Sequence, residues 1–270
     1  MNDSYIVPAY CVIADILKAY EYEDDRRAGV SAAEILLVAV VAAKYFQNHH
    51  ERALCILVRL GDIPHLSVSR FNRRLHALSD WLYNIVTVLG EMFTAGEAFI
   101  IDSMPLPVCK RVRARRCQKV RGKDYCGYCA AKKEKFFGWR LHLICTAEGI
   151  PVAFDMLPAA QQDLTPIHEL TANLPAGSAV FGDKGYISAE DARTILEAVG
   201  VRIVSIPRKN MPLNSWADEY DMRQYRKRIE TVYSQMEKMG VQRLHARTNG
   251  GFDLKAWASL LALAFTNIVD

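Results

Sequence analysis

The order of apolar patterns in the second half of the chain is the feature that most restricts its fold. Three strand-like runs come first, and helices and strands then alternate to the end of this region. The expected strands cover residues 97–102, 137–146, 151–159, 178–183 and 201–207, and the expected helices begin near Pro166, at 188 and before 223. This order predicts a mixed α/β sheet with helices on its faces.

Residues 5–95 have helical apolar spacing almost throughout. After a break near residue 65, Ser67 or Ser69 can cap a helix with one continuous apolar face. Three arginines, Arg70, Arg73 and Arg74, then lie on its exposed first turns. A turn followed by such a helix is typical of the second helix of a helix-turn-helix motif, although many helices carry solvated arginines.

Composition indicates a globular protein, with 51% hydrophobic and 24% charged residues in 270. The most apolar run, from Ala32 to Phe46, contains Glu34 and Lys44, so we expect a buried helix and no membrane span. The first ten residues lack the basic region of a signal peptide. We therefore expect a cytoplasmic, nucleoid-associated protein whose seven cysteines form no disulfides.

Positive charge is concentrated between Lys110 and Arg140, where twelve Lys or Arg face only two acids. The segment carries +10, so the remainder of this +4 chain sums to −6. Clustering of this kind favours a polyanion such as double-stranded DNA, and a solvated loop is the alternative. The expected DNA contacts in this segment are Arg111, Arg113, Arg115 and Arg116.

The basic segment also contains four cysteines, Cys109, Cys117, Cys126 and Cys129. A Cys-x-x-Cys pair with two further cysteines can form a tetrahedral zinc site. Only one close pair is present and the other spacings are irregular. Zinc is therefore the minor hypothesis, and plain thiols are the main one.

Two acids, Asp102 and Asp183, stand where apolar strands are expected to end, and Glu230 lies at the edge of an apolar helical stripe. Three carboxylates converging on one point suit two Mg²⁺ or Mn²⁺ ions, which stabilise the attacking and leaving oxygens of a displacement at phosphorus. Each acid also has a structural alternative: a loop cap for Asp102, a turn for Asp183, and an ion pair with Arg226 for Glu230.

Other polar residues flank these acids. Lys184, Arg226 and Arg228 are candidates for holding DNA phosphates, with solvated surface charge as the alternative for Arg228. Asp163 follows the third expected strand and can orient a metal-bound water, contact DNA or cap the next helix.

The chain resembles DDE transposases of bacterial insertion sequences, closest to the insertion sequence 982 family. The matching stretches include "IDSMPLPVC", "FGWRLHL", "PVAFDMLPAAQQDLTP", "FGDKGY", "RKRIETVYSQ" and "LHARTNGGFDLKAWASLLALAFTNI". The resemblance implies a ribonuclease H-like fold with a catalytic and metal-binding triad of Asp102, Asp183 and Glu230. It also implies DNA cleavage at terminal inverted repeats followed by strand transfer.

Taken with this resemblance, the patterns predict two domains. Residues 1–95 would form a helical region that binds the DNA ends, and residues 96–270 a catalytic domain with a basic insertion at 109–135. We expect a homodimer or larger assembly on DNA, since two transposon ends must be cut together. The run that ends at Asp270 stops inside an apolar helical pattern, so a short tail could be missing.

One departure from the family pattern concerns the last helix of the triad. Counting from Glu230, Arg226 matches the family's arginine, but Arg223 stands at the tyrosine position and Glu237 at the lysine position. This puts the DNA contacts of that helix in doubt. The rival hypotheses are a catalytically silent DNA-binding protein derived from a transposase, and a resolving or repair nuclease on the same fold.

Overall fold

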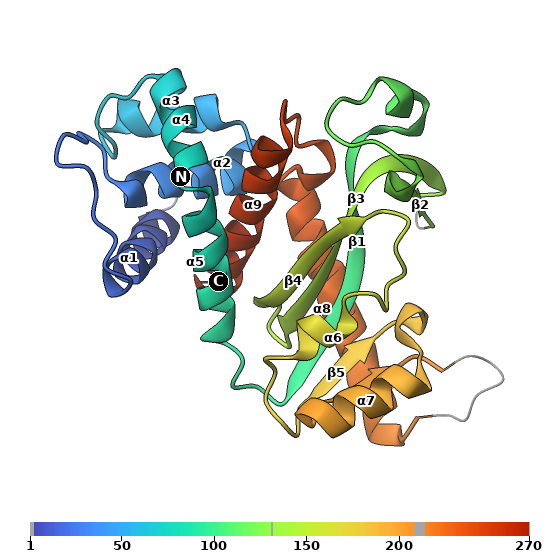
Figure 1. The fold of residues 1–270 in the computed structure, drawn as a ribbon. Coiled ribbons are helices and arrows are strands. Elements are labelled where there is room, and N and C mark those ends of the chain that lie inside the picture. The colour runs from blue at the N-terminus through green and yellow to red at the C-terminus, as the bar shows by residue number, and fades with distance from the viewer. Residues whose placement is uncertain (1–2, 131, 208–213, 270) are drawn as a thin grey trace. The chain divides into compact units, whose positions relative to one another are not determined.

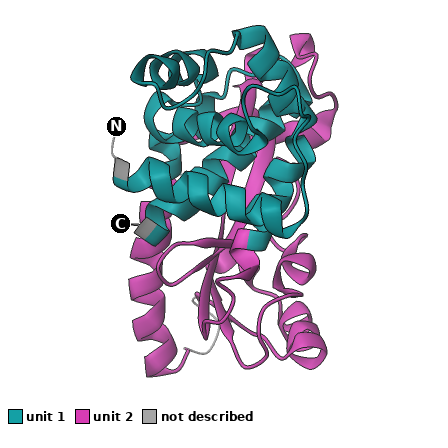
Figure 2. Ribbon diagram, turned by 90° about the vertical axis from the view of Figure 1, so that its left-hand side faces the viewer, with its two compact units in different colours: residues 1–88, 235–270 teal, residues 89–234 magenta. Residues whose placement is uncertain are grey.

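The computed structural model describes residues 3–130, 132–207 and 214–269 of the chain (Figure 1). These residues divide into two compact units, coloured separately in Figure 2. Unit 1 comprises residues 1–88 and 235–270, and unit 2 comprises residues 89–234. Helix α8 continues across the boundary at residue 234, so the chain passes from one unit to the other within a helix.

Unit 1 is helical and is built around α2. Eleven of the α2 residues between Ala32 and Ala43 are buried, because the helix is apolar on all sides and packs against α1, α3 and α9. The prediction of a buried helix here is confirmed. The helices of this unit are α1 (Asp3–Ala19), α2 (Ala32–Phe46), α3 (His50–Leu60), α4 (Val68–Ala77), most of α5 (Ser79–Glu91) and α9 (Asn249–Val269).

The apolar face after residue 67 forms two helices, and the expected single helix is wrong on this point. Ser67 caps α4 by accepting a hydrogen bond from the Arg70 N–H at 3.4 Å. The helix ends at Leu78, whose N–H bonds back to the carbonyls of both Arg74 and Leu75. The apolar spacing continues across this bend, because α4 and α5 both bury their apolar residues.

The length and polarity of the helices bear on the prediction that no segment spans a membrane. Among the residues that the structure describes, no helix combines the length and the apolar character needed to cross a membrane.

Unit 2 contains a mixed sheet of six strands in its described part. The order is β2-β3-β1-β5-β6. Strand β4 also pairs with β3, on the same edge as β2 but farther along β3. The antiparallel pairs β1–β3 and β3–β4 form the predicted meander, and β1, β5 and β6 are parallel. The strands are β1 (Ala98–Lys110), β2 (Cys126–Cys129), β3 (Glu134–Thr146), β4 (Pro151–Pro158), β5 (Ala179–Gly182) and β6 (Arg202–Ser205).

Helices cover both faces of this sheet. On one face, α6 (Ile167–Thr171) and α7 (Ala189–Val199) cover a core that includes Ile101 and Val180. On the other face, α8 (Trp216–Lys238) places Tyr225 against Phe181, with 4.8 Å between the ring centroids. The predicted sheet with flanking helices is confirmed, and it is compatible with a ribonuclease H-like fold.

Strand β1 is longer than its sequence indicates. We expected it to end at Asp102, before Pro105 and Pro107, but it continues to Lys110. Its neighbour β5 pairs only with Ala98–Ile100, so the far half of β1 has β3 on one side and, within the described part of the chain, no ladder partner on the other. Prolines are tolerated there, because the open edge needs no N–H donor.

The core of unit 2 can be tested at Ile101, which is 1% exposed. We expect Ile101→Ala to lower the free energy of unfolding by about 2–5 kcal/mol, because it removes buried methyl groups and leaves a cavity. Leu196 on α7 is 51% exposed, and Leu196→Ala should cost about 0.5 kcal/mol or less. Urea unfolding of both variants measures the difference, and equal losses would contradict this assignment of the core.

Candidate active site

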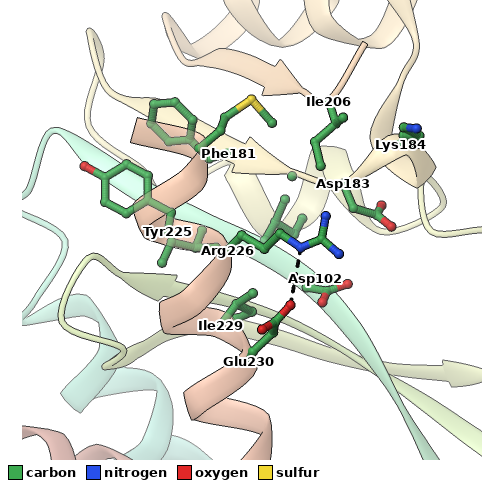
Figure 3. Close-up of a pocket in the computed structure, with 13 residues that line it drawn as sticks. Asp102, Phe181, Asp183, Lys184, Ile206, Tyr225, Arg226, Ile229 and Glu230 are labelled. Atoms are coloured by element: carbon green, nitrogen blue, oxygen red, sulfur yellow. Dashed lines mark hydrogen bonds and ion pairs between the residues drawn. The ribbon is translucent and has the colours of Figure 1, made fainter. Parts of the chain in front are cut away.

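A cavity of about 410 Å³ lies entirely within unit 2, at the end of β5. Asp102 on β1, Asp183 after β5 and Glu230 on α8 all line it (Figure 3). The three acids predicted from the sequence are thus brought together in one pocket. The strands that carry the first two are parallel neighbours, and α8 packs on the sheet face above them.

Asp102 has an unusual electrostatic environment. Burial, together with the charges of Asp183 and Asp163, raises the pKa of its carboxyl group to about 7. The Ser103 N–H, which donates to Asp102 Oδ1 at 2.7 Å, and Arg140 act in the opposite direction. Negative charge at this position is therefore poorly compensated by the described residues.

Asp183 has a structural role as well as a place in the pocket. Its Oδ1 accepts a hydrogen bond from the Gly185 N–H at 2.7 Å and so caps the short turn Lys184–Tyr186. The turn that was the alternative for this residue is therefore present. The second carboxylate oxygen of Asp183 has no hydrogen bond to any described residue. The next residue, Lys184, is exposed and lines the pocket.

Glu230 faces the pocket from α8 and is paired with Arg226 one turn earlier. The Arg226 Nε donates to Glu230 Oε1 at 3.3 Å, and both side chains are about two-thirds exposed. A pair this exposed contributes about 0.5 kcal/mol or less, so it restrains Glu230 only weakly. Arg226 also lines the pocket, where its guanidinium lies between the acidic side chains in Figure 3.

Arg228 lies elsewhere. Its guanidine group packs against the turn at Gly149, where a Cβ would be 2.9 Å from Arg228 Nε. It is half-buried and is not among the residues that line the pocket. In this arrangement Arg228 lies outside the pocket, and its phosphate contact stays a prediction.

Asp163 approaches the same acids from the loop after β4. The Ser103 hydroxyl donates to its Oδ1 at 2.7 Å, and Arg140 Nη1 lies 3.9 Å from that oxygen. A Cβ on Gly185 would be 2.7 Å from Asp163 Oδ2 and 2.9 Å from Asp183 Oδ1. The carboxylates of Asp163 and Asp183 therefore both lie against Gly185, where the Cβ of any larger residue would clash with their oxygens.

The capping role considered for Asp163 is absent. Helix α6 begins after Pro166 and has no side-chain cap. Instead Ser103 joins Asp163 to Asp102, since its N–H binds one carboxylate and its hydroxyl the other.

The fit of a divalent cation follows from these contacts. Carboxylate oxygens are the ligands that Mg²⁺ and Mn²⁺ prefer, and a bound cation would favour the ionised form of Asp102, whose pKa is raised by burial and by the charges of Asp183 and Asp163. In the arrangement that the structure describes, no three His, Cys, Asp or Glu side chains are close enough to hold a metal ion.

The basic segment extends from the sheet beside β3. Arg111, Arg113, Arg115 and Arg116 are exposed on a 3₁₀ helix spanning Arg111–Arg116. Within this segment Cys109 and Cys117 lie together, and burial and the neighbouring thiol raise the pKa of Cys109. Cys126 contacts Arg111 instead. Across the described residues, these cysteines do not form a group of three metal ligands.

The arginines of α4 in unit 1 differ in their surroundings. Arg70 and Arg73 are exposed. Arg74 is held inside the unit, because it donates to the Val30 carbonyl and forms a 3.1 Å ion pair with Asp24. Arg70 and Arg73 are thus the α4 arginines available to a ligand.

Two pocket residues on α8 were not predicted from the sequence. Met222 and Tyr225 form the wall of the pocket on α8. They precede Ile229 at helical steps of three and four, so the apolar stripe could have been followed one turn farther back. Asp163 was considered, but its spacing in the chain does not show that it lies next to Asp183.

Comparison with known proteins agrees with this geometry. A family model described as "Transposase DDE domain" matches residues 94–249, which is more than half of the chain. The chain belongs to this family of DDE transposases. No match was found among curated proteins or among solved structures.

The raised pKa of Asp102 predicts how stability depends on pH. The folded state binds this proton more tightly than the unfolded state, whose carboxyl titrates near pH 4. Stability should therefore fall as pH rises from about 4 to about 7 and stay reduced above that. In EDTA, we expect Asp102→Asn to raise the free energy of unfolding by about 1–3 kcal/mol at pH 8 and to change it little at pH 4.

Urea unfolding at the two pH values measures this effect. Asp62→Asn, at an exposed carboxyl group, is the control. An Asp102→Asn protein no more stable than wild type at pH 8 would contradict the assigned environment.

Proposed function

We propose that this chain is an active transposase of the insertion sequence 982 type. It cleaves DNA at the terminal inverted repeats of its insertion sequence and joins the ends to target DNA by phosphoryl transfer. Asp102, Asp183 and Glu230 are the proposed catalytic residues. The observation that carries this proposal is that these acids, widely separated in the chain, line one pocket.

The proposed cofactor is Mg²⁺ or Mn²⁺, with two ions per site. Asp102, Asp183 and Glu230 would hold the ions, and Asp163 is the candidate for a fourth carboxylate. When bound, the ions supply activation of the attacking oxygen and charge stabilisation of the leaving oxygen. Their positive charge would also relieve the repulsion that raises the pKa of Asp102.

The chain's own residues perform the positioning. Ser103 holds Asp102 and Asp163 in fixed directions, and Arg140 donates to the Ser103 hydroxyl at 3.2 Å. Arg226 and the exposed Lys184 line the pocket and are placed to bind phosphate oxygens of the DNA backbone. The apolar wall of Met222 and Ile206 limits access of water on one side.

DNA binding is proposed for two further regions. Residues 1–95 would bind the DNA ends with α3 and α4 as the helix-turn-helix element, and the exposed Arg70 and Arg73 would contact DNA. In the catalytic part, residues 96–270, the exposed arginines of the basic insertion at 109–135 would bind the backbone. A homodimer or larger assembly would pair the two ends.

The central test is cleavage of labelled DNA carrying the ends of the element, with Mg²⁺ or Mn²⁺. We expect metal-dependent cuts at the ends, and a loss of about 100-fold or more in Asp183→Asn, because the variant removes a charged ligand without changing its shape. Asp62→Asn, outside the pocket, should cut like wild type. Wild-type protein that binds these ends under either metal without cutting them would identify a catalytically silent DNA-binding protein.

Asp163 gives a second test of the same site. We expect Asp163→Asn to slow cleavage about 10- to 100-fold and to weaken the rise in melting temperature caused by Mn²⁺, because an oxygen facing Asp183 loses its charge. Asp155→Asn is the matched control, since Asp155 is half-buried on β4 opposite His142 and is not among the charges that raise the pKa of Asp102. If both variants keep the Mn²⁺ response of wild type, Asp163 has no part in metal binding.

A further inference from the structure

A second cavity, of about 530 Å³, lies wholly within unit 1. Its walls come from three places: the start of α3 with the residues before it, the helix α4, and residues 244–255, which lead into α9. It shares no residue with the acidic pocket of unit 2.

The lining residues of this cavity include four histidines, Arg247 and Lys255, with Glu51 as the one acid among them. The side chains of His76, His245 and Arg247 are exposed and form no hydrogen bond or ion pair with any residue that the structure describes. Lys255 Nζ also faces the cavity and donates to the Leu244 carbonyl at 2.8 Å. The charge of this cavity therefore favours an anion.

His50 lies in the wall of the same cavity. Its ring packs edge-on against Phe71, and its Nε2 is buried without a hydrogen-bond partner among the described residues. Burial, together with the charges of Lys255, His49 and His76, lowers the pKa of His50 to about 3. His50 is thus neutral and adds no positive charge to the cavity.

The backbone of the cavity is held in place. Asn48, 1% exposed, donates through Nδ2 to the Met239 carbonyl at 3.0 Å and to Ser259 Oγ at 2.9 Å. On the opposite wall, Thr248 Oγ1 accepts from the Gly251 N–H at 3.1 Å at the start of α9. These contacts fix the two walls that carry the basic side chains.

The start of α9 adds to the positive character of the cavity. Helix α9 has 21 residues, and the N-terminal end of a helix carries partial positive charge. Gly250 and Gly251 leave this end uncovered, so the ring of His76 comes close to the backbone; a Cβ on Gly251 would be 3.7 Å from His76 Cε1. Backbone and side chains thus converge on the same space.

We propose that this cavity binds a phosphate group of the DNA backbone through Arg247, His245 and His76. The inference rests on the proposed function for its choice of DNA as the source of the phosphate. A phosphodiester matches a cavity lined by Arg247, Lys255 and imidazole donors with one acid, and phosphate contacts are the majority of protein–DNA hydrogen bonds. The site would hold DNA without reading its sequence.

The test compares Arg247→Ala with Arg243→Ala in the full chain. Arg243 is exposed, lies four residues earlier in the chain and does not line the cavity. Binding of a short duplex is measured in EDTA over a range of salt concentrations, so that no cleavage is needed. We expect Arg247→Ala to weaken binding about three- to tenfold for every duplex sequence and to reduce the slope of log Kd against log salt by about 1. Arg243→Ala should keep both the affinity and the slope of wild type.

Two results would overturn the proposal. In the first, the two variants change binding equally. In the second, inorganic phosphate raises the melting temperature of wild type but not of Arg247→Ala, while both bind the duplex alike, so the cavity takes free phosphate. His245→Gln, with a smaller change in shape, should show the same direction as Arg247→Ala and guards against misfolding.

The outcome is separate from that of the catalytic test. Asp62→Asn, whose side chain lines neither cavity, should bind the duplex as wild type does. A wild-type protein that never cuts, but whose DNA binding depends on Arg247, would retain this site and lose the proposed catalysis.

Discussion

The parallel pairing of β1 with β5 is the constraint on which the rest of the candidate site depends. Ala98, Phe99 and Ile100 pair with Ala179, Val180 and Phe181, and each strand then delivers an acid just beyond this short ladder. Because β5 ends at Gly182 while β1 continues, Asp183 turns away from the sheet beside Asp102. Helix α8 adds Glu230 only because Tyr225 and Met222 pack on the face that carries Phe181.

This pairing places carboxylates where their charge is unfavourable without a counter-charge. Asp102 is the clearest case, since burial and two neighbouring acids raise its pKa to about 7. A fold selected only for stability would gain by an uncharged residue at this position. A cation bound at this site would offset the destabilisation caused by the buried carboxylate, and membership of the DDE transposase family gives a reason to expect such a cation.

Several elements were predictable because local pattern and tertiary structure agree in them. The meander, the buried helix α2 and the helix–strand alternation after residue 165 follow from apolar period and capping residues. Other elements were not. Strand β2 lies in a polar, basic segment and exists because it pairs with the first residues of β3. The bend at Leu78 and the continuation of β1 through two prolines depend on what lies beside those residues in space.

The sequence by itself determined the class of fold, the three acids and the excess of basic residues, because these follow from residue type and from spacing along one element. The tertiary structure decided which of these groups meet. It brought Asp163 and Asp183 together at Gly185, turned Arg228 to the Gly149 turn, and joined His76 of α4 with the basic residues before α9 around one cavity. Such contacts join segments far apart in the chain, and no period or spacing within a single segment encodes them.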